Sequence, residues 1–266
     1  MMNLLRCSLL ILGLGAGSCA PFYQATLPSA PLVRHRGEVA VIGSWLLSET
    51  GQATVAWSPV EHVRLGGTIT ACHSGEASPD SSDTYSYLRS RAYQVDAGYY
   101  FGVSQGRGVV EVSGSVGKSR SLAHGDAVID PFSYGSPVPG GGTGGKATRG
   151  LPDQIGEFRT VAGQVSGLWD REGPGSRQTG LLLRLSRVEC TRLTFDGQEL
   201  ARPANWYIEP AGLFRTKGQG LRAEFQLGYT LGLVAQPNNS VFPHVRPRVA
   251  VSLLAFPVVI YRKFKD

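Results

Sequence analysis

Side chains that could perform nucleophilic catalysis are few in this sequence. Ser–His catalysis needs an imidazole within reach of a hydroxyl and a third group that orients the ring. His73-Ser74 with Glu76 nearby is the one local cluster that has all the residue types of such a site. His124 with Asp126 is an equally weak candidate, because a histidine and a carboxylate in a loop do not specify a catalytic geometry. All fall in predicted loops or strand ends, where an ordinary polar surface explains them. We therefore assign no catalytic residue, and no Cys/His spacing predicts a metal site or a cofactor.

Cys19 is a better candidate for chemistry, as an acceptor of covalent lipid. The first residues carry one cation and a short apolar run, Cys7 to Leu14, which fits a cleaved secretory signal rather than a membrane span. Small residues directly before Cys19 look like a bacterial lipobox, whose cysteine becomes the acylated first residue of the mature protein. The sequence predicts a lipoprotein signal peptide over 1–18 and a lipidated linker over 19–35, with an acyl chain such as palmitate. An ordinary signal peptide cut nearby is the alternative.

A third group of candidates is ionic. Five charged residues in the last third of the chain fall on the polar faces of predicted strands, and on a barrel they would share one lumen wall: Arg184, Glu209, Arg222, Glu224 and Arg248. In a narrow barrel, opposed charges are expected to pair and fill the interior. An unpaired row would instead attract or conduct ions. Both signs are present, which favours the plug.

The elements that must position these residues are strands. Leu221–Leu233 alternates strictly between apolar and polar or small residues, and Tyr93–Val103 does so too. Period two indicates a strand, because successive side chains point to opposite faces. Both stretches are longer than the usual strand of a soluble protein and match the roughly 9–11 tilted residues that cross a membrane.

Weaker copies of this pattern predict about ten strands. Their ranges are Gly37–Leu47, Ala53–Trp57, Val63–Cys72, Tyr85–Val103, Gly108–Lys118, Glu157–Trp169, Gln178–Leu193, Asn205–Arg215, Gly220–Val234 and Val245–Tyr261. We predict an all-β fold over residues 36–266, an antiparallel up-and-down transmembrane β-barrel of about ten strands (roughly 8–12). The pattern leaves open which face is inside, so a soluble barrel with an apolar core remains an alternative. Outward aromatic girdles are predicted from Trp45, Trp57, Trp169, Trp206 and Tyr261.

The predicted connections differ in length on the two rims. Four short ones alternate with longer ones, with Ser48–Gln52 as the single short exception, and the longest is a Gly/Pro-rich surface loop near 119–156. This asymmetry is typical of outer-membrane barrels, whose short turns are periplasmic. An even strand count then places both ends of the barrel, and a lipid anchor at Cys19, on the periplasmic side of the cell outer membrane.

Composition narrows the possible partners. The chain has 266 residues, 35 of them Gly, and only 17% charged residues, which favours strands and turns. The formal net charge of +6 is spread along the chain, which argues against a nucleic-acid partner. Lipid of the outer membrane and a covalent lipid at Cys19 are the expected partners. Cys72 and Cys190 carry no disulfide signature, and whether they pair is open.

The residues after Cys19 carry a family resemblance. Cys-Ala-Pro-Phe-Tyr, then Pro31-Leu32 and Arg36-Gly37-Glu38, resembles the start of the uncharacterised outer-membrane β-barrel lipoproteins common in Bacteroidota. The similarity continues through the Trp57-Ser58-Pro59 turn and returns at Tyr207-Ile208-Glu209-Pro210. The resemblance implies location and fold, because most members have no assigned activity.

Three functions remain open from the sequence. The first is a non-catalytic outer-membrane barrel lipoprotein that serves as an envelope component, small pore or surface-binding protein. The second is a lipid-tethered soluble periplasmic barrel that binds an apolar ligand, and the third is an outer-membrane lipid hydrolase.

Overall fold

The computed structural model describes residues 23, 26–28, 33, 35–46, 50–77, 85–103, 107–124, 153–171, 177–216, 218, 220–233 and 245–257. These residues form eleven strands and one long sheet. The strands are β1 (Val39–Leu46), β2 (Thr50–Trp57), β3 (Val63–Ala77), β4 (Tyr85–Val103), β5 (Gly108–His124), β6 (Asp153–Arg171), β7 (Arg177–Phe195), β8 (Gln198–Glu199), β9 (Ala204–Thr216), β10 (Leu221–Gly232) and β11 (Val245–Ala255).

The sheet closes on itself. Every pairing is antiparallel, each long strand pairs with its neighbours in the chain, and β1 pairs with β11 to complete the ring. The short strand β8 only extends the edge of β7 beyond a tight turn, where Asp196 and Gly197 both have positive φ as a type I′ turn requires. The wall of the barrel therefore has ten strands, and the predicted antiparallel up-and-down barrel is confirmed.

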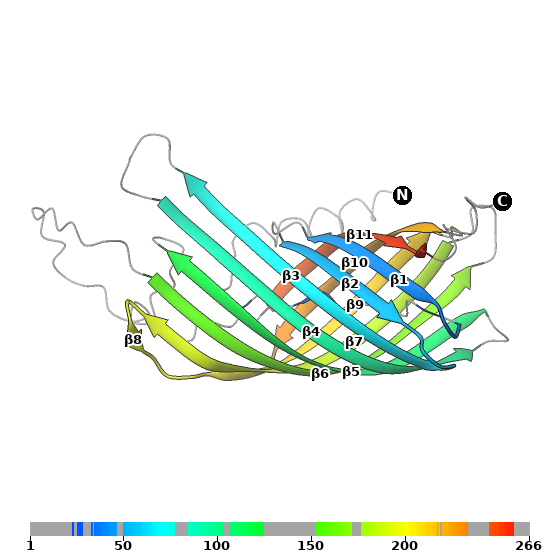
Figure 1. Ribbon diagram of the computed structural model, residues 1–266, viewed down its shortest axis with the longest axis horizontal. Helices are drawn as coiled ribbons and strands as arrows, with labels where there is room; N and C mark the ends of the chain where they lie inside the picture. Colours follow the sequence, from blue (N-terminus) through cyan, green and yellow to red (C-terminus); the bar gives the residue numbers. More distant parts are fainter. Residues whose placement is uncertain are drawn as a thin grey trace, which may run out of the picture.

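The two rims of the barrel differ as predicted. The connections after β2, β4, β6 and β9 are short, and we call this end the short-turn end. The opposite end carries the longer connections, apart from the three-residue connection between β1 and β2, and lies on the left in Figure 1. The wall is also uneven, because β4, β6 and β7 have 19 residues each whereas β1 and β2 have 8. The first residues of β1 and the last residues of β11 both lie at the short-turn end, because Val41 is the register partner of Ala255.

Several strands run further toward the long connections than the sequence pattern indicated. The predicted loop near 119–156 is shorter, because β5 continues to His124 and β6 begins at Asp153. Likewise β3 reaches Ala77. Outward charged residues interrupt the apolar alternation in these extensions, but the backbone ladder between strands does not depend on them. Tyr261 lies outside the described residues.

The outward face of the barrel is apolar and its interior is polar. On β4 the outward positions from Tyr93 to Phe101 are apolar, a length that fits a tilted membrane crossing. The buried positions instead include many hydroxyls, amides and charges, among them Thr54, Gln52 and Arg64. A soluble barrel would have the opposite arrangement, so the structure decides the question that the alternation left open.

Aromatic side chains border the apolar face at both ends. Trp57 and Trp169 are exposed near the short-turn end, and Trp45 and Trp206 are exposed nearer the long connections, with 72% of Trp45 accessible. Amphipathic rings at these two levels are typical of membrane interfaces. Among the described residues, no helix is long and apolar enough to span a membrane.

Candidate functional site

Residues described from the chain before β1 contact the inside of the barrel. Gly37 is held at the short-turn end, where its backbone N–H donates to the Ser58 carbonyl over 2.7 Å. Val33 is fully buried beside Tyr100 and Phe256 of the barrel wall. Further back in the chain, Thr26 and Leu27 contact the middle of the lumen. We call the described residues of this stretch, Tyr23, 26–28 and Val33, the lumen segment.

Two glutamines and an arginine bind the middle of the lumen segment. Gln52 on β2 makes a two-point contact with Leu27, accepting from its N–H at 2.8 Å and donating to its carbonyl at 3.2 Å. On the other side, the Thr26 hydroxyl donates to Gln94 of β4 at 2.7 Å, and Arg184 donates to both the hydroxyl and the carbonyl of Thr26 at 3.1 Å. Backbone groups of Thr26 and Leu27, which lie outside the strands, are thus satisfied by side chains of the wall.

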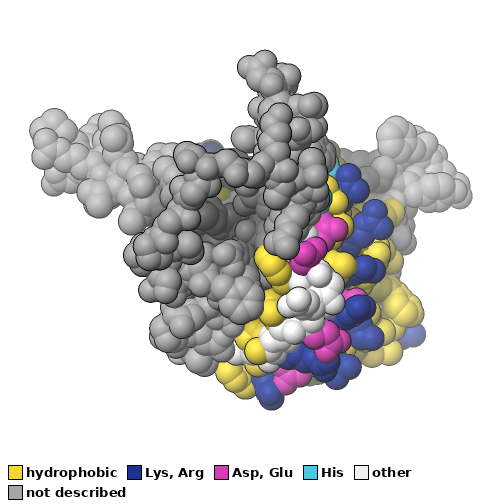
Figure 2. All heavy atoms as spheres, turned by 90° about the vertical axis from the view of Figure 1, so that its left-hand side faces the viewer, with side chains coloured by type: hydrophobic (Ala, Val, Ile, Leu, Met, Phe, Trp, Pro, Cys, Tyr) yellow, Lys and Arg dark blue, Asp and Glu magenta, His cyan; other side chains and the backbone are white. Residues whose placement is uncertain are grey.

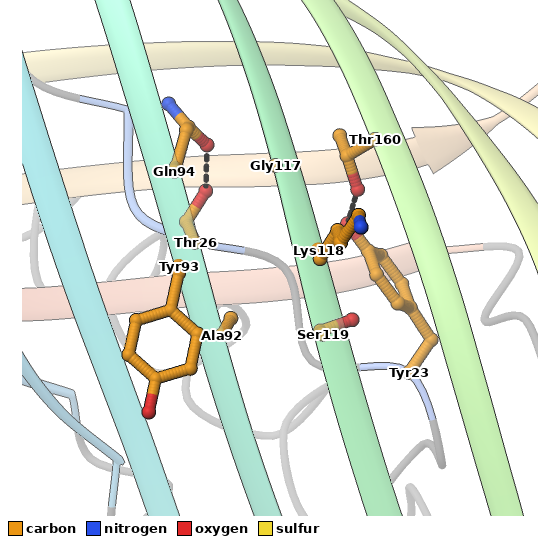
Figure 3. Close-up of a pocket in the computed structure, with 9 residues that line it drawn as sticks. All are labelled: Tyr23, Thr26, Ala92, Tyr93, Gln94, Gly117, Lys118, Ser119 and Thr160. Atoms are coloured by element: carbon orange, nitrogen blue, oxygen red, sulfur yellow. Dashed lines mark hydrogen bonds between the residues drawn. The ribbon is translucent and has the colours of Figure 1, made fainter.

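Tyr23 anchors the far end of the lumen segment, as Figure 3 shows. Its hydroxyl lies 3.3 Å from that of Thr160, and its ring packs edge-on against Phe158 at 5.3 Å and stacks on Tyr207 at 6.2 Å. Thr160 is seven residues from the long-connection end of β6 and eleven from the other end. The lumen segment therefore crosses from the short-turn end into the half of the barrel that carries the long connections.

Three of the five predicted network residues meet in the middle of the lumen. Glu209 on β9 lies 3.5 Å from Arg184 of β7 and 3.4 Å from Arg248 of β11, and all three side chains are at most 6% exposed. We call these residues the central cluster. Its two cations outnumber its one carboxylate, and Arg248 also donates to the Thr26 carbonyl at 3.4 Å. The central cluster thus joins the wall to the lumen segment.

The other two predicted residues lie elsewhere. Glu224 pairs with Arg215 of β9 at 2.6 Å, not with the central cluster. The Arg222 guanidinium lies 4.5 Å over the Phe256 ring near the short-turn end and donates to the Gly218 carbonyl. The distance along the strands separates both from Glu209, although all lie on inward faces as predicted.

A second ionic group was not included in the predicted network. Arg64 of β3 pairs with Asp96 of β4 at 2.5 Å and with Glu111 of β5 at 2.9 Å, and its side chain is 1% exposed. We call these three residues the short-turn cluster. Strand alternation also places these three residues at inward positions, so the sequence carries a signal for this cluster on the early strands as well.

Little free space remains in the lumen beside Tyr23 and Thr26. Between Tyr23, Thr26 and the walls of β4, β5 and β6 there remains a cavity of about 10 Å³, the size of a single water. Gly117 lines this cavity. A Cβ atom at this position would lie 2.8 Å from the Tyr93 carbonyl oxygen, so there is no room for a side chain. In the described part of the barrel, this region therefore offers no apolar chamber for a ligand.

The catalytic candidates of the sequence are not brought together. His73 is exposed on β3, and the side chains of Ser74 and Glu76 are outside the described residues. His124 lies 2.5 Å from Asp153 and stacks on Tyr87, whereas Asp126 is not described. Cys72 and Cys190 are both buried and form no disulfide with each other. Among the described residues no group of His, Cys, Asp and Glu could hold a metal, and Cys19 lies outside them.

Comparisons with known proteins give structural likenesses only. No family model matches the sequence. No curated protein matches it either. The translocator domain of autotransporter NalP from Neisseria meningitidis is 8% identical, with a TM-score of 0.48, and the match covers 82% of this chain and 86% of that one. An outer membrane channel from Pseudomonas putida F1 is 8% identical, with a TM-score of 0.42 and 87% and 99% covered. The KdgM porin is 8% identical, with a TM-score of 0.36 and 82% and 98% covered.

Proposed function

We propose that this protein is an outer-membrane barrel lipoprotein that serves as a closed, non-catalytic component of the cell envelope. The observation that carries the proposal is the lumen segment, which is bound inside a barrel with an apolar outer face. An open pore needs a continuous water path, and wall side chains bind Thr26 and Leu27 where that path would run. The pore version of the sequence hypothesis is therefore less well supported than the closed barrel.

The apolar face favours a membrane-integral barrel over a soluble domain tethered by lipid. Side chains such as Leu181, Val95 and Ile69 are more than half exposed, and burying them in lipid removes their apolar area from water. The polar, filled lumen also gives an apolar ligand no described chamber. An outer membrane, rather than a helical inner membrane, is where closed barrels of this kind are found.

Lipidation of Cys19 completes the proposal. The course of the lumen segment indicates on which side of the outer membrane the acyl chain lies. Cys19 precedes Tyr23 by four residues, which span at most about 14 Å. Tyr23 is in the half of the barrel with the long connections. We therefore favour an acyl chain on the long-connection side, in place of the periplasmic side expected from the turn pattern. Membership of the Bacteroidota lipoprotein group stays a prediction.

Membrane extraction after Cys19→Ser tests the barrel. Blocking acylation should leave the protein in the membrane fraction after alkaline carbonate washing, because the strands hold it there. A short periplasmic lipoprotein with a soluble domain, treated in parallel with its own Cys→Ser change, should be released. Release of this Cys19→Ser variant as a folded soluble protein would refute the membrane-integral barrel.

Surface labelling tests the side of the N-terminus. An epitope placed directly after Ala20 should bind antibody on intact cells, and the same epitope in the connection between β4 and β5 should bind only after the outer membrane is permeabilised. The reverse labelling pattern would instead place the lipid on the periplasmic side. For the hydrolase alternative, lipase activity of purified protein that is lost in His73→Ala would overturn the non-catalytic assignment.

A further inference from the structure

A group of cations covers the outer surface of β4, β5 and β6 beyond the apolar band. It consists of four exposed side chains that we call the outer cationic patch: Arg91, Lys118, Arg120 and Arg159. On the same strands the next outward positions toward the short-turn end are apolar: Tyr93, Val116 and Val161. Figure 2, which looks from the end of the long connections, shows Lys and Arg side chains gathered over the described outer surface, with carboxylates among them.

The sheet register places these like charges directly opposite one another. Arg91 faces Arg120 across β4 and β5, and Lys118 faces Arg159 across β5 and β6. Like charges at directly opposite positions on one face destabilise a sheet. Two such pairs in adjacent rows therefore cost stability unless an anion is bound between them.

Carboxylates of the barrel itself balance the patch only in part. Glu157 is the register partner of Arg120, and Glu189 is that of Arg159. Glu189, however, pairs with Arg187 at 2.5 Å. Across the described ranges, none of the four patch cations forms an ion pair with a carboxylate. The patch keeps an excess of positive charge on the long-connection side.

An apolar groove leads from the patch along the outer wall. Tyr93, Val95, Val116 and Val161 line a groove of about 430 Å³, and Lys118 and Arg159 line the same groove. Toward the short-turn end, Gly114 faces Gly163 across β5 and β6, and the space outside Gly163 is open. An acyl chain could lie along this line of small and branched residues with its headgroup at the cations.

We propose that the outer cationic patch and this groove bind a phosphorylated lipid of the outer leaflet. The phosphate would lie between Lys118 and Arg159, and an acyl chain would follow Val116 and Val161. Guanidinium and ammonium groups make charge-assisted hydrogen bonds to phosphate oxygens, and basic clusters at membrane surfaces attract anionic headgroups. The choice of leaflet rests on the proposed function, in which the long connections face outward.

Binding of lipid A to the purified full-length barrel tests this site. In a neutral detergent, native mass spectrometry should detect bound lipid A, and phosphatidylcholine should bind much less. The double variant Lys118→Gln/Arg159→Gln should lose about tenfold or more in lipid A affinity. The matched control Arg36→Gln/Arg177→Gln removes two exposed cations at the short-turn end and should bind as the wild type does. Equal loss in both double variants, or no loss in the patch variant, would overturn the proposal.

Two further measurements complete the test. Phosphate competition distinguishes recognition of the headgroup from recognition of the acyl chain, and melting temperatures distinguish loss of binding from loss of folding. Excess inorganic phosphate should compete only weakly with lipid A, because it cannot occupy the groove; full displacement would reduce the site to a phosphate site and refute the lipid. Without lipid, the patch variant should melt no lower than the wild type, since a repulsion is removed. Lipid A should raise the melting temperature of the wild type alone, and an equal rise in both would contradict the site. These assays in detergent do not depend on cell location, so they can fail independently of the labelling tests.

Discussion

The short-turn cluster and the central cluster use the same residue types in opposite proportions. In the first, Arg64 is shared by Asp96 and Glu111, so carboxylates are in excess. In the second, Glu209 is shared by Arg184 and Arg248, so guanidinium groups are in excess. The surplus donors of the central cluster bind the Thr26 carbonyl, whereas the contacts found for the short-turn cluster stay within the wall. Its excess of guanidinium donors therefore lets the central cluster hold a backbone carbonyl in the lumen.

The largest effect is expected from Glu209→Gln. The change leaves two buried guanidinium groups without a carboxylate and should lower the free energy of unfolding by about 3–5 kcal/mol. Urea titration of the barrel in detergent micelles, followed by tryptophan fluorescence, measures it. The exposed pair partner Glu189→Gln is the matched control and should change stability by about 1 kcal/mol or less. Equal stability of the two variants would contradict the comparison.

A smaller effect is expected from Glu111→Gln in the short-turn cluster. Arg64 keeps Asp96 as its partner, so the loss should be about 1.5–3 kcal/mol, the range for a hydrogen bond to a charged group. The same urea titration applies. Limited proteolysis should also find the lumen segment as protected as in the wild type, and a segment that becomes cleavable would show that the two clusters do not differ in role.

Gln52→Leu should weaken the lumen segment without breaking an ion pair. Both hydrogen bonds to Leu27 are lost and its backbone groups are left buried, so we expect a cost of about 1–3 kcal/mol and faster proteolysis of the segment. Thr68→Val is the control, because the Thr68 hydroxyl bonds only within the wall, to Thr54 at 3.0 Å among the contacts found. Faster cleavage in the control than in Gln52→Leu would sink this prediction.

The smallest change is expected from Tyr23→Phe. The variant loses the 3.3 Å hydrogen bond to Thr160 but keeps the ring contacts with Phe158 and Tyr207. We expect a loss of about 0.5–1.5 kcal/mol in the free energy of unfolding and unchanged proteolysis of the segment. A loss as large as that of Glu209→Gln would mean that the end of the segment, rather than the central cluster, holds it in place.

The strands of the barrel could be predicted from the sequence because their signal is local. The limits predicted for Tyr85–Val103 agree with β4, since its outward positions are apolar over most of its length. The ends of β5 and β6 were missed where Lys118, Arg120 and Glu157 replace apolar residues on the outer face. Backbone pairing between the strands continues past the apolar band, where the sequence no longer alternates between apolar and polar residues. The alternation therefore gives no signal for these strand ends.

The site was predictable only in part. Inward charges at Arg184, Glu209 and Arg248 follow from strand alternation, but their pairing depends on register between strands far apart in sequence. The lumen segment was read as a linker, because Thr26, Leu27 and Pro28 show no periodicity. A segment that has no repeating pattern and is bound one contact at a time leaves no signal for sequence reasoning.

Conductance in planar bilayers tests the closed lumen most directly. The wild-type protein should insert without steady channels, and a variant that lacks residues 23–33 should open stable ones, because the wall side chains then face an empty lumen. Resistance of both proteins to unfolding in unheated SDS gels would establish that each is a folded barrel. Steady wild-type channels of the same conductance as those of the deletion variant would contradict a lumen closed by the N-terminal segment.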